Sequence, residues 1–274
     1  MHYVVSDVHG HVEQLVEALQ RSNLLDAGRV WSGGNAHLTF LGDYFDRGPD
    51  GIAVVELVRR LQDEARAAGG RVEALIGNHE ILALGMHHFG GRNVHSDLWS
   101  RRSFARSWAM NGGQVRDQQS FSDEHIQWLC ALDSVALAGP DLLLHSDTIE
   151  YLRWGDTIQE INDGVRKVLA SDDLAAWWQC WVRLTSRYAF ATFDGEQVAT
   201  DLLDLLGGQR IVHGHSIITT FTGQSPDEVT GPLSYAGGQV LAIDGGLYGG
   251  GPCLVVRLDR ESASSPDVSP VAPA

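Results

Sequence analysis

Residues 37–48, HLTFLGDYFDRG, place a short apolar run directly before a charged cluster. The run from Leu38 to Leu41 has the length and composition of a buried strand. Gly42 allows the backbone to turn closely, so Asp43 is expected just beyond the carboxyl end of that strand. Four apolar residues then recur at the i, i+3, i+4 and i+7 positions of a helix: Val54, Leu57, Val58 and Leu61. This stretch therefore predicts a strand, a polar turn and an amphipathic helix.

The same alternation of strand and helix signals continues along most of the chain. Five further apolar runs end at a charged, amide or imidazole residue: Tyr3 to Val5 before Asp7, Val72 to Ile76 before Asn78, Leu142 to Leu144 before His145, Ile211-Val212 before His213-Gly214-His215, and Val240 to Ile243 before Asp244. Two further stripes have helical spacing: Val12, Leu15, Val16 and Leu19, and Ile158, Ile161, Val165, Val168 and Leu169. Alternating strands and helices predict an α/β layered fold. In open α/β sheets, ligands bind beyond the carboxyl ends of the strands, which is where these polar residues fall.

The composition suits one large domain, expected at residues 1–260. The chain has 274 residues, of which 43% are hydrophobic, so a sizeable core is expected. Residues 261–274, rich in Ser, Pro and Ala, are expected to form a disordered tail. The formal net charge of −15 argues against a sequence-independent nucleic-acid binder.

The sequence also predicts where the protein works. No stretch approaches the roughly 20 apolar residues that a membrane-spanning helix needs, and no signal-peptide pattern opens the chain. The three cysteines, Cys130, Cys180 and Cys253, lie far apart, which fits a reducing compartment. We expect a cytoplasmic protein with neither a nucleic-acid nor a membrane partner.

Three short motifs follow the first three predicted strands: Asp7-Val8-His9-Gly10, Gly42-Asp43-Tyr44-Phe45-Asp46-Arg47-Gly48 and Gly77-Asn78-His79-Glu80. Taken singly, each has an ordinary interpretation: a turn before a helix, a surface Asp–Arg turn, and a helix N-cap. A lone histidine at a strand end, such as His145 or His215, is also more often structural than a ligand. Together, two Asp, one Asn and three His form an oxygen and nitrogen set without thiolates, which suits Mn²⁺, Fe or Zn²⁺. Two such ions, about 3.5–4 Å apart, can clamp a phosphoryl group and lower the pKa of a bound water.

The ordered series of these motifs resembles the calcineurin-like metallophosphoesterases. The Asp46-Arg47-Gly48 and Asn78-His79-Glu80 endings are similar to the phosphoprotein phosphatase branch. The stretch from residue 6 to about 88 is particularly similar to bacterial Shewanella-like phosphatases, and the matching motifs extend to about residue 250. The resemblance implies a four-layer αββα sandwich with two mixed sheets, helices on the outside and a dimetal site at the strand ends.

The resemblance also implies a role for each motif residue. Asp7 and His9 would hold one metal, and Asp43 would bridge both. Three residues would complete the second metal site: Asn78, His145 and His215. His79, paired with Asp46, would be the general acid for the leaving group, Arg47 would bind phosphate oxygens, and a metal-bound hydroxide would attack the phosphorus.

Some positions depart from the family pattern or match it less specifically. Ser6 stands where the branch usually has Gly, and Ser146-Asp147 follows His145 where eukaryotic members have two glycines. The second phosphate-binding arginine is expected to be Arg183, with Arg187 as the alternative. Asp244 would support the site.

Three functions are consistent with these motifs. The first is a phosphatase for phosphoproteins, at Ser/Thr or Tyr, or for small phosphoesters. The second is a nucleotide hydrolase resembling diadenosine tetraphosphatases, which usually lack the intact Asp-Arg-Gly found at Asp46 to Gly48. The third is a catalytically silent binding module that has kept the metal site, which is the least favoured because every expected ligand and the general acid are present.

Two further segments leave alternatives open. Residues 85–118 show little periodicity and are expected to be an insertion near the site. They form either a substrate-selecting cap, with Arg101, Arg102 or Arg106 near the phosphate, or a solvated insertion whose arginines offset acidic charge. Three tryptophans are expected to pack from a helix into the hydrophobic core rather than to form a substrate wall: Trp177, Trp178 and Trp181.

Overall fold

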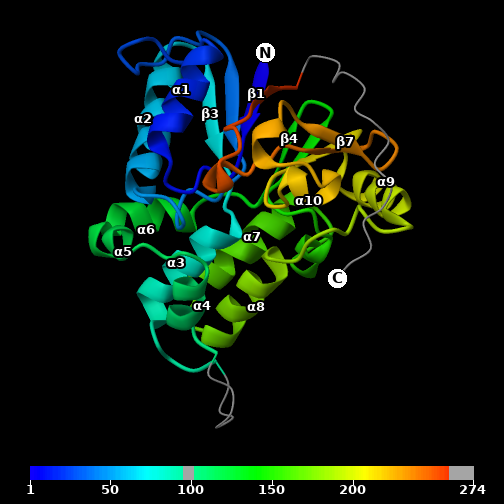
Figure 1. Ribbon diagram of the computed structural model, residues 1–274. Coiled ribbons are helices and arrows are strands. Elements are labelled where there is room, and N and C mark those ends of the chain that lie inside the picture. Colours follow the sequence, from blue (N-terminus) through cyan, green and yellow to red (C-terminus); the bar gives the residue numbers. More distant parts are fainter. Residues whose placement is uncertain (95–101, 259–274) are drawn as a thin grey trace.

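Two mixed β-sheets form the centre of the computed structural model, which describes residues 1–94 and 102–258 (Figure 1). The first sheet has the strand order β3-β2-β1-β9. Its strands are β1 (His2–Val5), β2 (His37–Phe40), β3 (Arg71–Ala74) and β9 (Val255–Arg257). The first three strands are parallel and in register, so their carboxyl ends lie along one edge, and β9 runs antiparallel to β1.

The second sheet repeats this arrangement around a different set of strands. Its order is β4-β5-β6-β8-β7. Its strands are β4 (Val135–Ala138), β5 (Asp141–Leu144), β6 (Arg210–His213), β7 (Leu233–Tyr235) and β8 (Val240–Ala242). β5, β6 and β8 are parallel, whereas β4 and β7 pair antiparallel at the two edges. All six strands that the apolar runs predict are confirmed, and the added β4, β7 and β9 are edge strands.

Both sheets bury both of their faces, which explains why the strands contain continuous apolar runs. Val4 of β1, Leu143 of β5 and Val212 of β6 belong to a small cluster in which the two sheets pack against each other. Val5 and Leu144, their neighbours on the opposite faces, belong to the larger outer core. Because successive side chains in a strand point to opposite faces, this alternation produces four layers, with helices outermost. The four-layer sandwich expected from the resemblance is therefore confirmed.

The helices cover the sheets and also form a group beyond the strand ends. The longest are α1 (Val12–Arg21), α2 (Gly51–Ala67), α3 (Asn78–Phe89), α7 (Ile158–Leu169), α8 (Leu174–Leu184) and α9 (Gly195–Leu206). Shorter ones are α4 (Phe104–Met110), α5 (Val115–Ser120), α6 (Asp123–Cys130) and α10 (Ile218–Thr222), with 3-10 turns η1 (Glu150–Arg153), η2 (Pro226–Glu228) and η3 (Leu247–Gly249). In Figure 1, α3, α4, α7 and α8 gather below the sheets.

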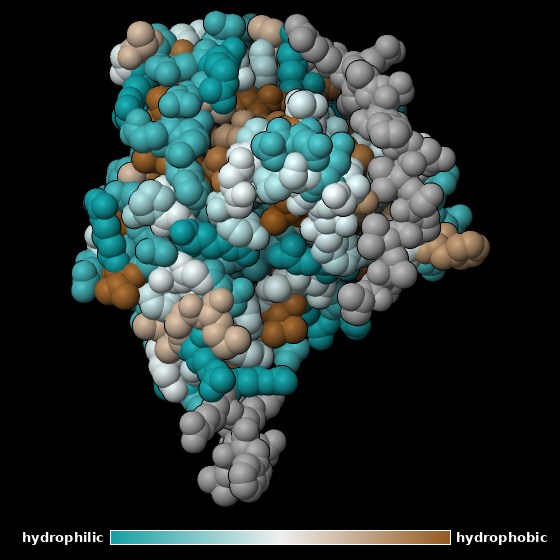
Figure 2. Space-filling view, in the orientation of Figure 1, coloured by the Kyte–Doolittle hydropathy of each residue, from teal (hydrophilic) through white to brown (hydrophobic). Residues whose placement is uncertain are grey.

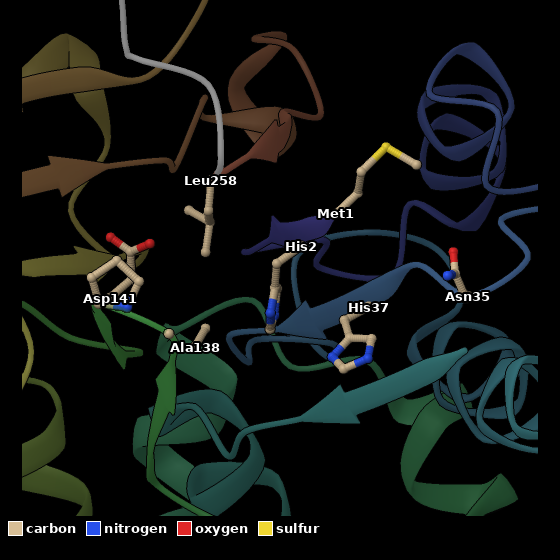
Figure 3. Close-up of a pocket in the computed structure, with 9 residues that line it drawn as sticks. Met1, His2, Asn35, His37, Ala138, Asp141 and Leu258 are labelled. Carbon is tan, nitrogen blue, oxygen red and sulfur yellow. The ribbon is translucent and has the colours of Figure 1, made fainter. Parts of the chain in front are cut away.

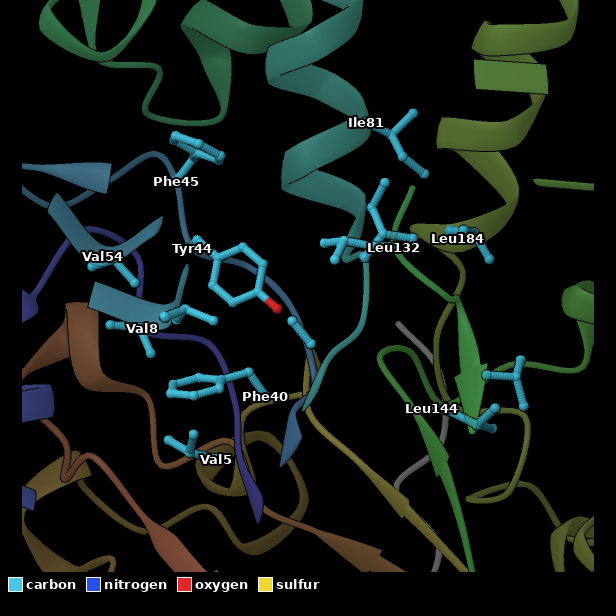
Figure 4. Close-up of a cluster of buried hydrophobic side chains, with 14 of the residues drawn as sticks. Val5, Val8, Phe40, Tyr44, Phe45, Val54, Ile81, Leu132, Leu144 and Leu184 are labelled. Carbon is cyan, nitrogen blue, oxygen red and sulfur yellow. The ribbon is translucent and has the colours of Figure 1, made fainter. Parts of the chain in front are cut away.

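The loops that leave the first sheet rest on a packed aromatic core. Figure 4 shows Tyr44 and Phe45 directed into the cluster beside Phe40, Val8 and Val54. Both aromatic side chains are fully buried, and the Tyr44 hydroxyl donates to the carbonyl of Leu75 at 2.7 Å. The turn that follows β2 is consequently fixed from below by packing and a hydrogen bond.

The face of the molecule seen in Figure 2 is predominantly polar. Hydrophilic side chains cover most of the face seen in Figure 2, and hydrophobic ones appear only in scattered patches. Within the described residues, the helices are all too short or too polar to cross a bilayer.

Candidate metal centre

Polar side chains from both sheets converge at the carboxyl ends of their parallel strands. Asp7 follows β1, Asp43 follows β2 and Asn78 opens α3 after β3. From the second sheet, His145 follows β5 and His215 follows β6. All five are buried, with at most 3% of the side chain exposed. The structure therefore brings together residues that lie as much as 208 positions apart in the chain.

The turns that carry these side chains use an uncommon backbone conformation. Ten non-glycine residues in the described part of the chain have a positive φ, and six of them belong to the predicted site: Asp7, His9, Asp43, Asp46, Arg47 and His215. Such conformations cost energy and persist only where the surrounding structure enforces them. Their concentration here indicates a site held in place by the fold.

Asp43 lies at the centre of the cluster, and its two oxygens face different histidines. Oδ2 lies 3.6 Å from Nε2 of His9, whereas Oδ1 lies 3.2 Å from Nε2 of His145. Potential ligand atoms of His9, Asp43 and His79 lie within 4.8 Å of one another, as do those of Asp43, His145 and His215. Because both groups include Asp43, one carboxylate is placed to bridge two cations.

Two glycines allow this close approach of the loops. A Cβ atom on Gly77 would lie 2.3 Å from Oδ1 of Asp43, and one on Gly42 would lie 2.5 Å from the amide nitrogen of Gly77. Glu80 fixes the same turn, because its carboxylate accepts hydrogen bonds from the amides of Asp43, Tyr44 and Gly77 at 2.7–2.8 Å. The sequence analysis quoted Glu80 within a motif but assigned it no role.

Three histidines are each oriented by a backbone carbonyl. His9 donates from Nδ1 to Phe45 at 2.8 Å, and His145 donates from Nδ1 to Leu41 at 3.0 Å. His215 donates from Nε2 to Thr185 at 3.1 Å. A carbonyl accepts only, so the second ring nitrogen is the one available to a cation, which is how metal-binding histidines are usually supported.

Asp7 and Asn78 lie beside these two groups. Oδ2 of Asp7 accepts from the amide of His215 at 2.8 Å and from the Ser6 hydroxyl, and its Oδ1 lies 3.9 Å from Nε2 of His9. Oδ1 of Asn78 lies 2.9 Å from Nε2 of His145. Gly214 permits the approach of Asp7, since a Cβ there would lie 2.1 Å from the carboxylate.

The electrostatics of the cluster fit bound cations. Burial raises the pKa of Asp7 and of the adjacent Asp244, and the neighbouring Asp43 carboxylate adds to both effects. Burial lowers the pKa of His9 and of His215, and each has a nearby histidine that lowers it further. His9 and His215 are thus held neutral, as metal-binding imidazoles are. Burial acts to lower the pKa of His145 as well, but the charge and hydrogen bond of Asp43 outweigh it and raise that pKa to about 9.

His79 is held differently from the other three histidines. Its Nδ1 lies 2.7 Å from Oδ2 of Asp46, and its Nε2 lies 4.0 Å from Oδ2 of Asp43. Burial acts to lower the pKa of His79, but the charge of Asp43 and the hydrogen bond to Asp46 outweigh it and raise the pKa. A buried histidine that keeps its proton beside a carboxylate is suited to general acid work.

Three arginines were expected to bind phosphate: Arg47, and either Arg183 or Arg187 as a second one. They lie in different surroundings. Arg47 has one guanidinium nitrogen 3.0 Å from His9 Nε2 and another 3.1 Å from His79 Nε2. Arg187 donates to the carbonyl of His215 at 2.7 Å, beside the cluster. Arg183, the first choice from the sequence, instead pairs with Glu150 of η1. The geometry therefore favours Arg187 over Arg183.

Other expected residues separate into those at the cluster and those away from it. His213 faces Tyr235, whose hydroxyl lies 2.8 Å from Nε2, and it does not join the ligands. Trp177 and Trp178 are buried in the core and Trp181 packs against it, as expected. Residue 85 falls inside α3, which ends at Phe89, so the segment expected at 85–118 begins with the last five residues of that helix.

Within the rest of that segment, Arg102 and Arg106 are exposed, whereas Arg101 lies outside the described residues, as does the expected tail at 261–274. Trp108, which the sequence analysis did not single out, donates to Oδ1 of Asp46 at 2.9 Å. Tyr248 of η3 was also missed, and its ring lies 4.1 Å from the guanidinium carbon of Arg47. Both contacts join distant segments, so no local spacing signalled them.

A separate cavity lies at the opposite ends of the strands. It has a volume of about 460 Å³ and is lined by residues that include Met1, His2, His37 and Asp141 (Figure 3). Burial and the nearby His37 lower the pKa of His2 to about 4. Because β1, β2 and β5 begin here, this cavity is distinct from the metal centre at the strand carboxyl ends.

Comparison with known protein families gives a match over most of the chain. The family model described as calcineurin-like phosphoesterase matches residues 3–218. A solved cold-active protein-tyrosine phosphatase from a Shewanella species superposes with a TM-score of 0.68 over 93% of this chain and 73% of its own, at 24% identity. At that identity the likeness concerns the fold.

Curated relatives match over a shorter segment. Shewanella-like protein phosphatase 2 of Arabidopsis thaliana is 35% identical over 78 residues, which are 28% of this chain and 20% of that protein. The asymmetrical bis(5'-nucleosyl)-tetraphosphatase of Oceanobacillus iheyensis is 38% identical over 65 residues, 23% of this chain and 26% of that protein. The matches thus span about a fifth to a quarter of these relatives' lengths.

Proposed function

This chain belongs to the calcineurin-like phosphoesterase family, and from that premise we propose that it is a metal-dependent phosphatase acting on phosphomonoesters. One observation carries the proposal: Asp43 is shared by two groups of potential metal ligands, directly beside the His79–Asp46 pair and Arg47. Potential metal ligands, a proton donor and a phosphate-binding arginine thus surround a single point, as hydrolysis of a phosphate ester requires.

The proposal places two divalent cations, Mn²⁺, Fe or Zn²⁺, on either side of Asp43, with Asp7 in place of His79 in the first ligand group and Asn78 added to the second. Asp7, His9 and Asp43 would hold the first. Asp43 would be shared with the second, whose remaining ligands would be Asn78, His145 and His215. When bound, two such ions supply Lewis-acid stabilisation of the phosphoryl group and a water of lowered pKa.

The chain's own residues bind the phosphate and supply a proton. Arg47 presents a planar fork of donors, which matches the geometry of phosphate oxygens. Arg187 is the better-placed second arginine for phosphate binding, because Arg183 would first have to break its ion pair with Glu150. His79 is anchored at Nδ1 by Asp46, and its Nε2 faces Arg47 at 3.1 Å. When Arg47 turns to the phosphate oxygens, Nε2 is free to carry the proton that goes to the leaving oxygen.

The substrate class comprises phosphoproteins, at Ser/Thr or Tyr, and small phosphoesters, and the proposed location is the cytoplasm. Arg47 beside His79 supports a phosphatase, because its donors suit a terminal phosphate with free oxygens. The identity shared with a bis(5'-nucleosyl)-tetraphosphatase keeps dinucleotide hydrolysis as the second candidate. A silent binding module stays the least favoured candidate, since all the expected ligands and the His79–Asp46 pair are present and His9, His145 and His215 are each oriented by a backbone carbonyl.

The test uses the full chain, stripped of metal and then supplied with Mn²⁺. We expect release of phosphate from p-nitrophenyl phosphate and phosphopeptides that depends on the added metal, with diadenosine tetraphosphate cleaved poorly. Preferential cleavage of the dinucleotide would move the protein to the second candidate. Binding of two metals without turnover of any of these substrates would favour the silent module.

A further inference from the structure

The indole of Trp108 contacts the Asp46 carboxylate from a separate segment of the chain. Its Nε1 donates to Oδ1 at 2.9 Å, and the other carboxylate oxygen, Oδ2, lies 2.7 Å from Nδ1 of His79. Asp46 and His79 are each 1% exposed and Trp108 is 7% exposed. Each oxygen of Asp46 therefore has one buried partner, and the three side chains form a continuous series that ends at His79.

Among the described residues, Trp108 and His79 are the side chains that hydrogen-bond to the Asp46 carboxylate, and both lie outside its own loop. Asp46 and Arg47 are consecutive non-glycine residues with φ of 66°, a conformation that the surroundings must enforce. The outer torsion of an aspartate is broad, so packing alone leaves the carboxylate plane poorly defined. An indole N–H donates only, and one bond to the outer oxygen fixes the direction of the inner one.

The residues after Trp108 make room for the indole and hold the next residue of the loop. A Cβ on Gly113 would lie 2.1 Å from Cε2 of Trp108, so only glycine permits the ring to lie there. The carbonyl of Gly112 accepts from the amide of Arg47 at 2.7 Å. The segment 108–113 thus holds Asp46 by a side chain and Arg47 by its backbone.

The helix that carries Trp108 packs on the helix that carries His79. A Cβ on Gly85 of α3 would lie 2.4 Å from the ring of Phe104, so α4 approaches α3 closely at this point. His79 lies in the first turn of α3, and Ser103 caps the amino end of α4. Donor and acid are consequently mounted on two helices packed against each other.

We propose that Trp108 is a positioning residue for proton delivery to the leaving group, acting through Asp46 on His79. The inference rests on the proposed phosphatase function. It adds a residue whose effect on the rate depends on how much the leaving group needs a proton. A water oxygen forms the new bond to phosphorus and gives up a proton, while the P–O bond to the leaving group breaks. The electron pair of that bond goes to the leaving oxygen, which takes the proton from His79 Nε2. A poor leaving group depends on that proton, whereas a good one departs without it.

The test compares Trp108→Phe with the unmodified protein on two substrates, phenyl phosphate and 2,4-dinitrophenyl phosphate, in the Mn²⁺-loaded full chain. Phenylalanine keeps a buried ring but removes the N–H donor. We expect kcat on phenyl phosphate to fall about 10-fold, a fraction of what general acid catalysis contributes, with KM and the dinitrophenyl reaction little changed. Trp177→Phe is the matched control, because it removes an indole bond of 2.8 Å, to the Ser171 carbonyl, outside the site.

The ratio of the two rates does not depend on how much of the variant is folded, so reduced stability does not obscure the result. In a His79→Ala background, Trp108→Phe should change this ratio no further, since both substitutions act on one proton transfer. Equal losses on both substrates, or a loss that persists in full without His79, would overturn the inference and leave the phosphatase standing. An unmodified protein that hydrolyses neither substrate would overturn the proposed function and the inference with it.

Discussion

At the scale of single residues, His79 could be either a metal ligand or the general acid. His79 belongs by distance to one of the two ligand groups, yet its Nδ1 faces the Asp46 carboxylate rather than a backbone carbonyl. His9, His145 and His215 each face a carbonyl instead. The difference in partner supports an acid at position 79 and ligands at the other three.

Substituting His79→Ala tests that separation. We expect the variant to keep two metal ions per chain, because no ligand is removed, while turnover of phenyl phosphate falls by about 10²- to 10⁴-fold with the loss of the acid. Metal content by mass spectrometry and steady-state kinetics measure the two effects. A variant with one ion per chain would show instead that His79 is a ligand.

Residues that follow a predicted strand could be placed in the site from the sequence, and the others could not. Asp43 and His145 end apolar runs, so the rule that ligands collect at strand carboxyl ends located them. Trp108, Glu80 and Tyr248 act through contacts between distant segments, which leave no pattern in local spacing. The choice between Arg183 and Arg187 likewise depended on Glu150, which pairs with the former.

At the scale of secondary structure, the segment after α3 supports the amino end of α2. Asp117 of α5 accepts hydrogen bonds from the Gly51 amide, at 3.0 and 3.2 Å, and from the Ile52 amide at 3.4 Å. Burial nevertheless raises the pKa of Asp117 to about 6, with a smaller contribution from the nearby Asp46. A carboxyl whose folded pKa is raised holds its proton more tightly when folded, so its stabilising contribution is lost as pH rises through that value.

The substitution Asp117→Asn should remove this pH dependence. Asparagine keeps one oxygen acceptor for the Gly51 amide and cannot ionise. The difference in unfolding free energy, variant minus unmodified protein, should be about 1 kcal/mol larger at pH 7 than at pH 4. Urea unfolding of both proteins at the two pH values measures the difference. A difference that stays constant with pH would contradict this account of Asp117.

Helices with a strong apolar period and strands that lead into a polar residue of the site were predictable, whereas the antiparallel edge strands and α3 were not. The apolar stripes of α1, α2 and α7 predicted those helices, and the apolar runs predicted the parallel strands. β4, β7 and β9 pair antiparallel at sheet edges and do not lead into the polar site residues that follow the parallel strands, so their sequences carry little signal. α3 is buried on most sides along its first half, which removes the alternation that marks an amphipathic helix.

At the scale of the whole molecule, the site exists only because two sheets pack against each other. Periodicity predicted alternating strands and helices, but the division into two facing sheets came from the family resemblance alone. The small core between the sheets takes residues from both, including Val4 and Val212, and so sets the distance between the two sets of strand ends. Asp43 comes from the first sheet, whereas His145 and His215 come from the second.

We propose that Asp43 bridges two metal ions across this junction, and the number of metal ions bound per chain decides whether it does. The full chain and its Asp43→Ala variant would be loaded with Mn²⁺, freed of excess metal and analysed by mass spectrometry. Asp172→Ala, which removes an exposed carboxylate paired with His88, is the control. We expect two ions in the unmodified protein and the control, and fewer than one in the Asp43→Ala variant. One ion or none in the unmodified protein, or two retained without Asp43, would contradict the account.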